Sequence, residues 1–221
     1  MKPLLFALGF APLTVAPAEA ISCAGVTDVT ALPAAGCADG GFTFSGFAVS
    51  PSAGFAETTV GIGAVTQNVN GTNLNFQLAV PGPGPGDVLL SYAVATPTGS
   101  LVEVDLANNA ILAPVTIGEL VCRQPFGPLG TCAPADRLAA LVAGPGEHVV
   151  ALLSDAVASA GIRKDISFGF GGFLTDFTNS HRRVVTAPPP PVPVPEPATL
   201  LLVASSLGAA GLVARRRARP R

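Results

Sequence analysis

The chain has 221 residues, of which 49% are hydrophobic and only 12% are charged, and its formal net charge is −2. The segment from residue 21 to residue 197 holds six Lys and Arg residues against thirteen Asp and Glu residues, a net charge of −7. Nucleic-acid binding requires a basic patch, so we expect no nucleic-acid partner. Trp is absent and Tyr92 is the single Tyr, so few aromatic side chains are available to stack on sugars outside a core.

The beginning of the chain has the pattern of a secretory signal peptide. A minimal basic start precedes an apolar run over residues 4–15, which has the length of a signal-peptide core. Ala18 and Ala20 form an A-x-A cleavage site. We therefore expect signal peptidase to remove residues 1–20, so that the mature chain begins at Ile21.

The four cysteines indicate disulfides, because an exported chain enters an oxidising compartment. Of three possible pairings we favour Cys23 with Cys37 and Cys122 with Cys132, since each pair brackets a Gly- and Pro-rich loop. A zinc site is the alternative. It is disfavoured because the chain has no C-x-x-C spacing and its two histidines lie far from the cysteines in sequence. We expect neither a metal nor a cofactor.

The body of the chain, residues 21–186, reads as short strands separated by turn residues. The alternation is clearest over residues 74–80, where large apolar side chains fall on one face. Strands are predicted over residues 42–49, 59–65, 74–80, 88–95, 101–106, 111–121, 148–153 and 166–174. This spacing indicates an all-β, antiparallel β-sandwich ectodomain. The Ala-rich residues 137–142 and 152–160 are predicted to form brief helices.

The two histidines are the first candidates for catalysis. A Ser–His mechanism needs a nucleophile, a base and an orienting residue within reach, and the chain has no G-x-S-x-G motif. His148 is expected in an exposed turn at the start of a strand, and His181 in a polar exit from the last strand. Neither context predicts a catalytic histidine.

A pair of carboxylates is the second candidate. Glu103 and Asp105 fall on the same side of one predicted strand, as a glycosidase pair would. We interpret them as solvent-facing residues of a strand whose other side, Val102, Val104 and Leu106, points inward. The sequence therefore predicts no catalytic residue and no enzymatic activity.

The C-terminal part of the chain has three successive compositions. Residues 187–197 form a Pro-rich linker, which we expect to be extended because proline fixes φ and lacks a backbone donor. Residues 198–214 carry no charge, and as a transmembrane helix they would run about 25 Å, near the short limit for a membrane span. Residues 215–221 form a basic tail, which is expected on the cytoplasmic side. The stop-transfer residues are Arg215, Arg216, Arg217 and Arg219. A buried core helix is the alternative, and these flanks disfavour it.

A short motif stands directly before the apolar stretch: Val194, Pro195, Glu196 and Pro197. Together with the apolar stretch and the Arg cluster, it resembles the PEP-CTERM sorting signal of Gram-negative bacteria. In that family Pro-Glu-Pro is the recognition motif, and a membrane-embedded exosortase is thought to process the tail. The resemblance covers residues 194–221. It implies an intermediate anchored in the inner membrane with a periplasmic ectodomain, followed by delivery to the cell surface or beyond.

The body also resembles β-sandwich ectodomains of PEP-CTERM proteins. The matching features are an early cysteine pair, a Phe-rich strand with Phe42, Phe44 and Phe47, a Gly-Glu-x-x-Cys motif ending at Cys122, and Lys-Asp-Ile starting at Lys164. This resemblance implies a fold and supplies no activity.

We therefore expect an exported, exosortase-sorted surface or matrix protein, associated with biofilm or exopolysaccharide and without catalytic activity. A polysaccharide-binding module is one alternative, and a secreted hydrolase dependent on His148 or His181 is another. The binding alternative is motivated by polar residues on and between the predicted strands over residues 59–65 and 74–80: Thr66, Gln67, Asn68, Asn70, Asn73, Asn75 and Gln77.

Overall fold

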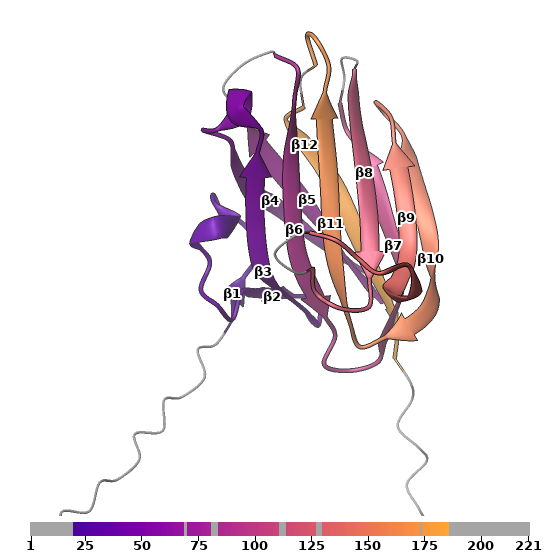
Figure 1. Ribbon diagram of the computed structural model, residues 1–221. Helices are drawn as coiled ribbons and strands as arrows, with labels where there is room; N and C mark the ends of the chain where they lie inside the picture. The colour runs from indigo at the N-terminus through magenta and orange to yellow at the C-terminus, as the bar shows by residue number, and fades with distance from the viewer. Residues whose placement is uncertain are drawn as a thin grey trace, which may run out of the picture. The chain divides into compact units, whose positions relative to one another are not determined.

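Figure 1 shows a computed structural model of the chain, in which two β-sheets pack face to face as two layers. The structure describes residues 20–68, 70–80, 84–110, 114–126, 130–172 and 174–185. Both ends of this region lie at the bottom of the view in Figure 1. The signal-peptide core, Ala18, the linker, the sorting motif, the apolar stretch and the basic tail lie outside the described residues.

The front layer in Figure 1 is a seven-stranded sheet in the order β1-β2-β3-β6-β11-β8-β9. Neighbouring strands are antiparallel, except that β1 and β2 are parallel. The strands are β1 (Ile21–Ser22), β2 (Cys37–Asp39), β3 (Phe42–Pro51), β6 (Gly86–Ala95), β11 (Ser159–Phe168), β8 (Val115–Cys122) and β9 (Arg137–Ala143).

The second layer is a five-stranded antiparallel sheet in the order β10-β7-β12-β5-β4. Its strands are β10 (His148–Val157), β7 (Ser100–Asn108), β12 (Asp176–Val184), β5 (Gly71–Ala79) and β4 (Thr59–Asn68). Three short 3₁₀ turns complete the described elements: η1 (Val29–Ala31), η2 (Ala53–Phe55) and η3 (Pro134–Asp136). No helix in this described part of the chain has the length and apolar character needed to cross a membrane.

Period-two alternation builds the core between the layers. On β5 the side chains of Leu74, Phe76 and Leu78 are buried, while the residues between them are not. The ring of Phe76 stacks on that of Phe177 from β12, with centroids 5.0 Å apart. The predicted all-β sandwich is confirmed, and the predicted strands over residues 42–49, 59–65, 88–95, 101–106 and 148–153 lie within observed strands. The predicted strand over residues 74–80 extends one residue beyond the end of β5 at Ala79.

The two predicted helices are wrong. Residues 137–142 belong to β9, residues 152–157 to β10 and residues 159–160 to β11. The sequence indicates a helix at β9 because its two buried leucines, Leu138 and Leu141, are three residues apart, which is a helical spacing. A register irregularity between Val121 and Cys122 on the neighbouring strand shifts the alternation there. Pairing with β8 therefore overrides the helical preference of alanine.

The predicted strand over residues 166–174 is wrong in its second half. β11 ends at Phe168, and Gly172 N–H closes a turn onto the carbonyl of Gly169 at 3.0 Å. For residues 111–121, β8 begins at Val115, and residues 111–113 lie outside the described region. On β7 the side chain of Leu101 is buried and that of Val102 is not, because a register shift occurs there; the predicted inward position of Val102 is wrong.

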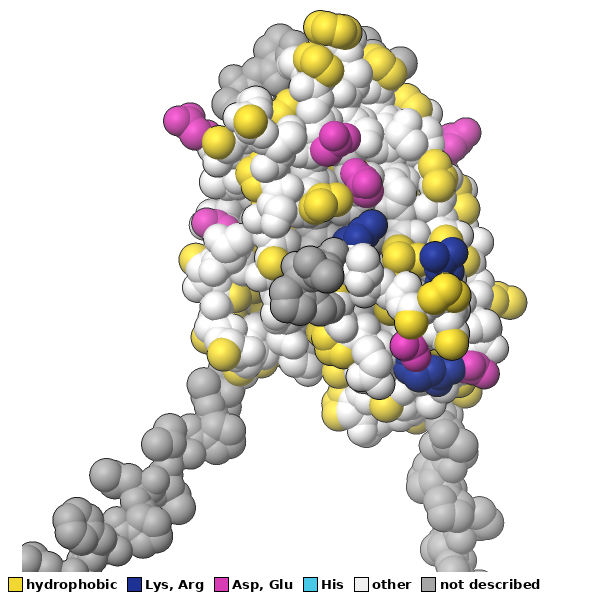
Figure 2. Space-filling model, in the orientation of Figure 1, with side chains coloured by type: hydrophobic (Ala, Val, Ile, Leu, Met, Phe, Trp, Pro, Cys, Tyr) yellow, Lys and Arg dark blue, Asp and Glu magenta, His cyan; other side chains and the backbone are white. Residues whose placement is uncertain are grey.

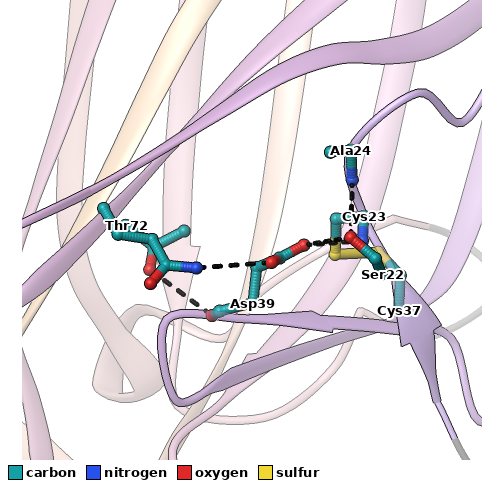
Figure 3. Close-up of a disulfide and its surroundings, with 7 residues drawn as sticks. Ser22, Cys23, Ala24, Cys37, Asp39 and Thr72 are labelled. Atoms are coloured by element: carbon teal, nitrogen blue, oxygen red, sulfur yellow. Dashed lines mark hydrogen bonds between the residues drawn. A yellow bond between two sulfur atoms is a disulfide. The ribbon is translucent and has the colours of Figure 1, made fainter.

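The disulfide pairing predicted from the loops is confirmed. Cys23 pairs with Cys37, with Cα atoms 4.9 Å apart, and Cys122 pairs with Cys132 at 6.2 Å. Figure 3 shows that Asp39 anchors the first disulfide, because its carboxylate accepts the Cys23 N–H at 2.6 Å. By restricting the unfolded chain, closure of a loop of this size stabilises the fold by about 3 kcal/mol.

Candidate functional site

The outer surface of the five-stranded sheet carries a continuous array of polar side chains, which we call the polar face. Register places Thr178 beside Asn75, and Ser180 between Asn73 and Asp105. No aromatic side chain occupies an outward position on these five strands within the described residues. The polar face consists of Thr66 on β4; Asn73, Asn75 and Gln77 on β5; Asp176, Thr178 and Arg182 on β12; Glu103 and Asp105 on β7; and His148 on β10.

Asp176 is the best-fixed carboxylate of the polar face. Its Oδ1 accepts hydrogen bonds from the amides of Asn75 at 3.1 Å and Asn109 at 2.6 Å, and its Oδ2 accepts the Thr175 hydroxyl at 3.0 Å. Burial raises the pKa of Asp176, and the three hydrogen bonds together lower it by a larger amount. The pKa of this carboxylate therefore lies below its usual value. The carboxylate is therefore a fixed anion and acceptor at neutral pH.

A hollow of about 380 Å³ lies beside Asp176. Gly61 on β4 forms part of its wall, where a Cβ would lie 2.7 Å from the backbone oxygen of Val26. The full lining consists of Thr27, Thr59, Gly61, Gln77, Leu78, Ala79, Thr175 and Asp176. This hollow therefore presents hydroxyl, amide and carboxylate groups together with short apolar side chains.

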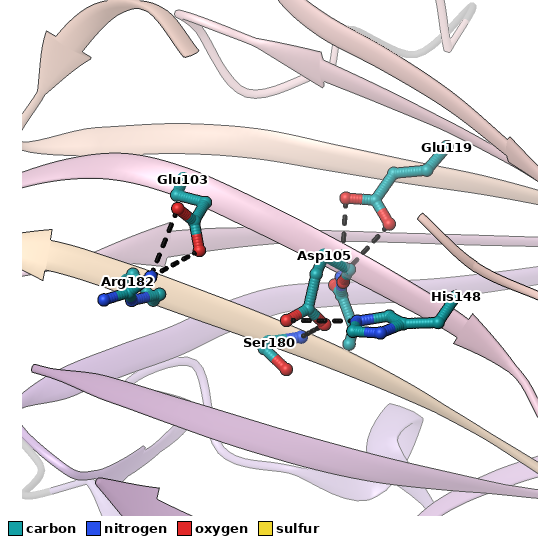
Figure 4. Close-up of polar contacts among 7 residues, drawn as sticks. Glu103, Asp105, Glu119, His148, Ser180 and Arg182 are labelled. Carbon is teal, nitrogen blue, oxygen red and sulfur yellow. Dashed lines mark hydrogen bonds and ion pairs between the residues drawn. The ribbon is translucent and has the colours of Figure 1, made fainter. Parts of the chain in front are cut away.

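A second hollow, of about 480 Å³, lies further along the polar face. An ion pair and a contact between a histidine ring and a carboxylate lie along it, as Figure 4 shows. Arg182 donates to both carboxylate oxygens of Glu103, at 3.0 and 3.3 Å, and His148 Nε2 lies 3.5 Å from Asp105 Oδ2. The full lining is Asn68, Asn70, Glu103, Asp105, His148, Val150 and Arg182.

The opposite outer surface has a different character. Figure 2 shows the outer side of the seven-stranded sheet, where charged side chains are few and scattered among uncharged ones. Arg163 is partly exposed on β11 of this sheet, and its guanidinium lies 5.8 Å from the ring centroid of Phe126.

The structure separates the two histidines that a hydrolase would use. His148 begins β10 and is exposed, as predicted, and its ring contacts Asp105. No Ser, Thr or Cys side chain lies within hydrogen-bond distance of that ring among the described residues. The prediction that His181 lies in a polar exit is wrong, since its side chain is fully buried in the middle of β12.

His181 belongs to a second group of polar residues, which lies in the interior between the sheets. We call it the polar core cluster: Tyr92, Glu119, Lys164, Asn179 and His181. Lys164, Asn179 and His181 are 0% exposed. Tyr92, Glu119 and Lys164 come from the seven-stranded sheet, and the other two residues come from the five-stranded sheet. The cluster therefore joins the two layers through polar contacts.

Hydrogen bonds connect the members of the polar core cluster. Lys164 forms a buried ion pair with Glu119, and Asn179 Nδ2 donates to Glu119 Oε2 at 3.1 Å. The Tyr92 hydroxyl donates to Asn179 Oδ1 and lies 3.4 Å from His181 Nε2. The Lys164 ammonium lies 5.3 Å from the centroid of the Phe177 ring.

Burial changes the protonation of this cluster. It lowers the pKa of His181 to about 3, with a further lowering from the positive charge of Lys164. It also lowers the pKa of Lys164, against the opposing effect of Glu119. The Tyr92 pKa is raised well above its usual value by burial and by the charge of Glu119. His181 is therefore neutral and Tyr92 remains a hydrogen-bond donor at neutral pH.

Sequence reasoning missed this cluster, although the alternation of the strands contains its signal. Lys164 stands between Ile162 and Ile166, which share its side of β11. Glu119 likewise stands between two inward residues, Ile117 and Val121. A polar residue at the centre of an inward row is predicted to be buried, and this argument also holds for Asn179 and Tyr92.

Sequence comparison identifies the C-terminal signal. Residues 193–217 match the PEP-CTERM protein-sorting motif. The match covers the predicted Val194-Pro195-Glu196-Pro197 element, the apolar stretch and the first arginines. Among curated proteins, none matches this chain in sequence. The chain thus carries a PEP-CTERM sorting motif, and the motif match does not extend to the sandwich.

Comparison of folds finds distant β-rich structures. TmCBM61, solved in complex with beta-1,4-galactotriose, has 14% identity and a TM-score of 0.38 over 64% of this chain and 90% of that chain. A CBM4 structure has 11% identity and a TM-score of 0.30, over 66% and 87% of the two chains. The enzymatically active domain of bacteriophage CBA120 tailspike protein 4 has 13% identity and a TM-score of 0.32, over 66% and 19%. At these values the similarity identifies neither a ligand nor an activity.

Proposed function

We propose that this chain is an exported, exosortase-sorted protein of the cell surface or extracellular matrix. The observation that carries the proposal is the PEP-CTERM sorting motif over residues 193–217. The two disulfides support it, because such bonds form in oxidising compartments. In this proposal signal peptidase removes residues 1–20, the inner membrane holds an intermediate through residues 198–214, and an exosortase-type enzyme then processes the tail.

Replacement of the motif glutamate tests the sorting step. We expect Glu196→Ala to leave the ectodomain in the inner-membrane fraction with its tail uncleaved, because recognition is lost while export continues. Pro189→Ala, in the same linker but outside the motif, is the matched control and should be sorted as the native chain is. Fractionation with intact-mass analysis measures both outcomes. A native chain recovered from the cytosol with residues 1–20 intact would contradict the proposal.

The polar face favours a second part of the proposal, that the ectodomain binds an extracellular polysaccharide and performs no catalysis. Its amide and hydroxyl side chains offer the donors and acceptors that sugar hydroxyls need. Three carboxylates, Glu103, Asp105 and Asp176, stand beside a single arginine, Arg182, so a neutral polymer suits this surface better than a polyanion. The two hollows on the polar face could each accommodate sugar units of such a polymer.

Two outward amides provide the test of polysaccharide binding. Asn73 and Gln77 make no side-chain hydrogen bond within the described residues, so their removal spares the fold. We expect Asn73→Ala with Gln77→Ala to weaken glycan binding roughly thirtyfold, since each of the two lost hydrogen bonds is worth about 1 kcal/mol. Thr116→Ala, exposed on β8 of the opposite sheet, is the control. The measurement is a glycan array followed by titration, and no retention on any extracellular polysaccharide would contradict the binding role.

A further inference from the structure

A primary amine and a carboxamide meet at one carboxylate in the interior of the sandwich. Lys164 projects from β11 of one sheet, and Asn179 projects from β12 of the other; both are 0% exposed. Lys164 Nζ and Asn179 Nδ2 contact the same atom, Oε2 of Glu119, the second at 3.1 Å. The nucleophile of an acyl transfer, its amide acceptor and a proton carrier are thus brought together without water access.

The other contacts of Asn179 prepare its carbonyl for attack. The Tyr92 hydroxyl donates to Oδ1, the atom on which negative charge develops in a tetrahedral intermediate. The Asp105 carbonyl accepts a hydrogen bond from Nδ2 and holds the amide in position. Tyr92 is itself buried, and the raised pKa of its phenol keeps the donor protonated.

We propose that Lys164 and Asn179 join in an intramolecular isopeptide bond that links the two sheets covalently. Glu119 is the acid–base residue of this reaction, and Tyr92 stabilises the oxyanion. The bond is a property of the ectodomain alone, and it stands whether or not the polar face binds a polysaccharide.

The reaction begins when the Lys164 ammonium passes one proton to the Glu119 carboxylate. This exchange removes two opposite charges from the interior, where charged forms are costly, and burial lowers the pKa of Lys164 in the same direction. The lone pair of the neutral amine then attacks Cγ of Asn179. The carbonyl electron pair moves onto Oδ1, where the Tyr92 hydroxyl holds it.

The tetrahedral intermediate collapses toward a new amide. Protonated Glu119 gives its proton to Nδ2 of Asn179, the carbonyl re-forms, the Cγ–Nδ2 bond breaks and ammonia leaves. The attacking nitrogen of Lys164 then returns one proton to Glu119. The products are one secondary amide, one ammonia and a neutral Glu119, so atoms and charge balance without an oxidant, reductant or cofactor.

Proteolysis before aspartate tests for the bond in the full-length protein. Cleavage before Asp165 and Asp176 separates Lys164 from Asn179 in the sequence, so after disulfide reduction only a covalent link can keep them together. We expect tandem mass spectrometry to find a branched peptide that is lighter than its two parts by one ammonia. A succinimide at Asn179 also releases ammonia but leaves the peptides separate. Two separate peptides with unmodified Lys164 would overturn the proposal.

Variants of the polar core cluster test the assigned roles. Glu119→Gln keeps the shape of the side chain and removes the proton carrier, so we expect linkage to slow roughly 10²–10⁴-fold. Tyr92→Phe removes only the hydroxyl that donates to Asn179 Oδ1, and we expect it to slow formation of the bond roughly 10²-fold. This variant provides a second measurement if Glu119→Gln fails to fold. Lys164→Met is the control without a nucleophile. Linkage at the native rate in Glu119→Gln or in Tyr92→Phe would overturn the role assigned to that residue.

Discussion

His181 couples the stability of the sandwich to pH. Its side chain is fully buried on β12, its ring lies 5.2 Å from that of Phe44, and its pKa in the folded chain is lowered to about 3. In the unfolded chain the group has the ordinary pKa of 6.5. Between these values the unfolded state binds a proton that the folded state cannot take up, so stability falls as the pH decreases through this window.

We expect the free energy of unfolding to decrease by on the order of 4 kcal/mol between pH 6.5 and pH 3 through His181 alone. His181→Phe should remove most of this dependence, because phenylalanine does not titrate and suits the aromatic surroundings. His148→Gln, at the exposed histidine, is the matched control and should retain it. Urea unfolding at several pH values measures the effect, and an unchanged slope in His181→Phe would contradict the assignment.

For the polar residues of β7, the side of the strand could be predicted from the sequence, but the contact partners could not. The outward position of Glu103 and Asp105 could be predicted because alternation assigns a side to each residue of a strand. Their partners Arg182 and His148 could not, because these contacts depend on the register between strands far apart in the chain. Asn109 reaches Asp176 for the same reason.

At the scale of elements, the turn before β2 depends on one glycine. Gly36 has φ +73°, and a Cβ there would lie 1.9 Å from the backbone oxygen of Phe44 on β3. Gly25, at the other end of the same disulfide loop, has φ +78° with no atom within 4 Å of such a Cβ. The two positions share the backbone conformation that favours glycine and differ in the space around it.

We therefore expect Gly36→Ala to destabilise the fold more than Gly25→Ala. The second variant should cost roughly 1–2 kcal/mol, the penalty of a left-handed conformation for an L-residue. The first adds a collision with strand β3, which should bring the total to about 3–4 kcal/mol or prevent closure of the disulfide loop. Thermal unfolding and thiol titration measure these effects, and equal losses in the two variants would show that β3 moves aside.

The two wrong helix predictions, over β9 and over the end of β10, have a common physical cause. β9 and β10 lie at the edges of their sheets, where each pairs on one side only. Their alanines and register irregularities weaken the alternation that identifies a strand, so local preference indicated helices. β5, in contrast, has neighbours on both sides and an unbroken alternation of large apolar residues, and its position could be predicted from sequence.

For the whole molecule, the layered architecture followed from strand spacing, and the disulfide pairing followed from the composition of the loops. The order of strands within each sheet did not follow, because β6 and β11 are neighbours although sixty-odd residues separate them in the sequence. The polar core cluster depends on that order, since it draws on β6, β8, β11 and β12. Alternation could predict that its members point inward but could not predict that they meet.

The place of β12 has a mechanical consequence. This strand is the last one before the sorting motif, and it runs in the middle of its sheet with β7 on one side and β5 on the other. A load applied through the C-terminal end would pull β12 lengthwise against two hydrogen-bonded ladders, so both would have to shear at once. Forced unfolding is governed by the height of such a barrier, and a strand in this position gives a tethered domain resistance to drag.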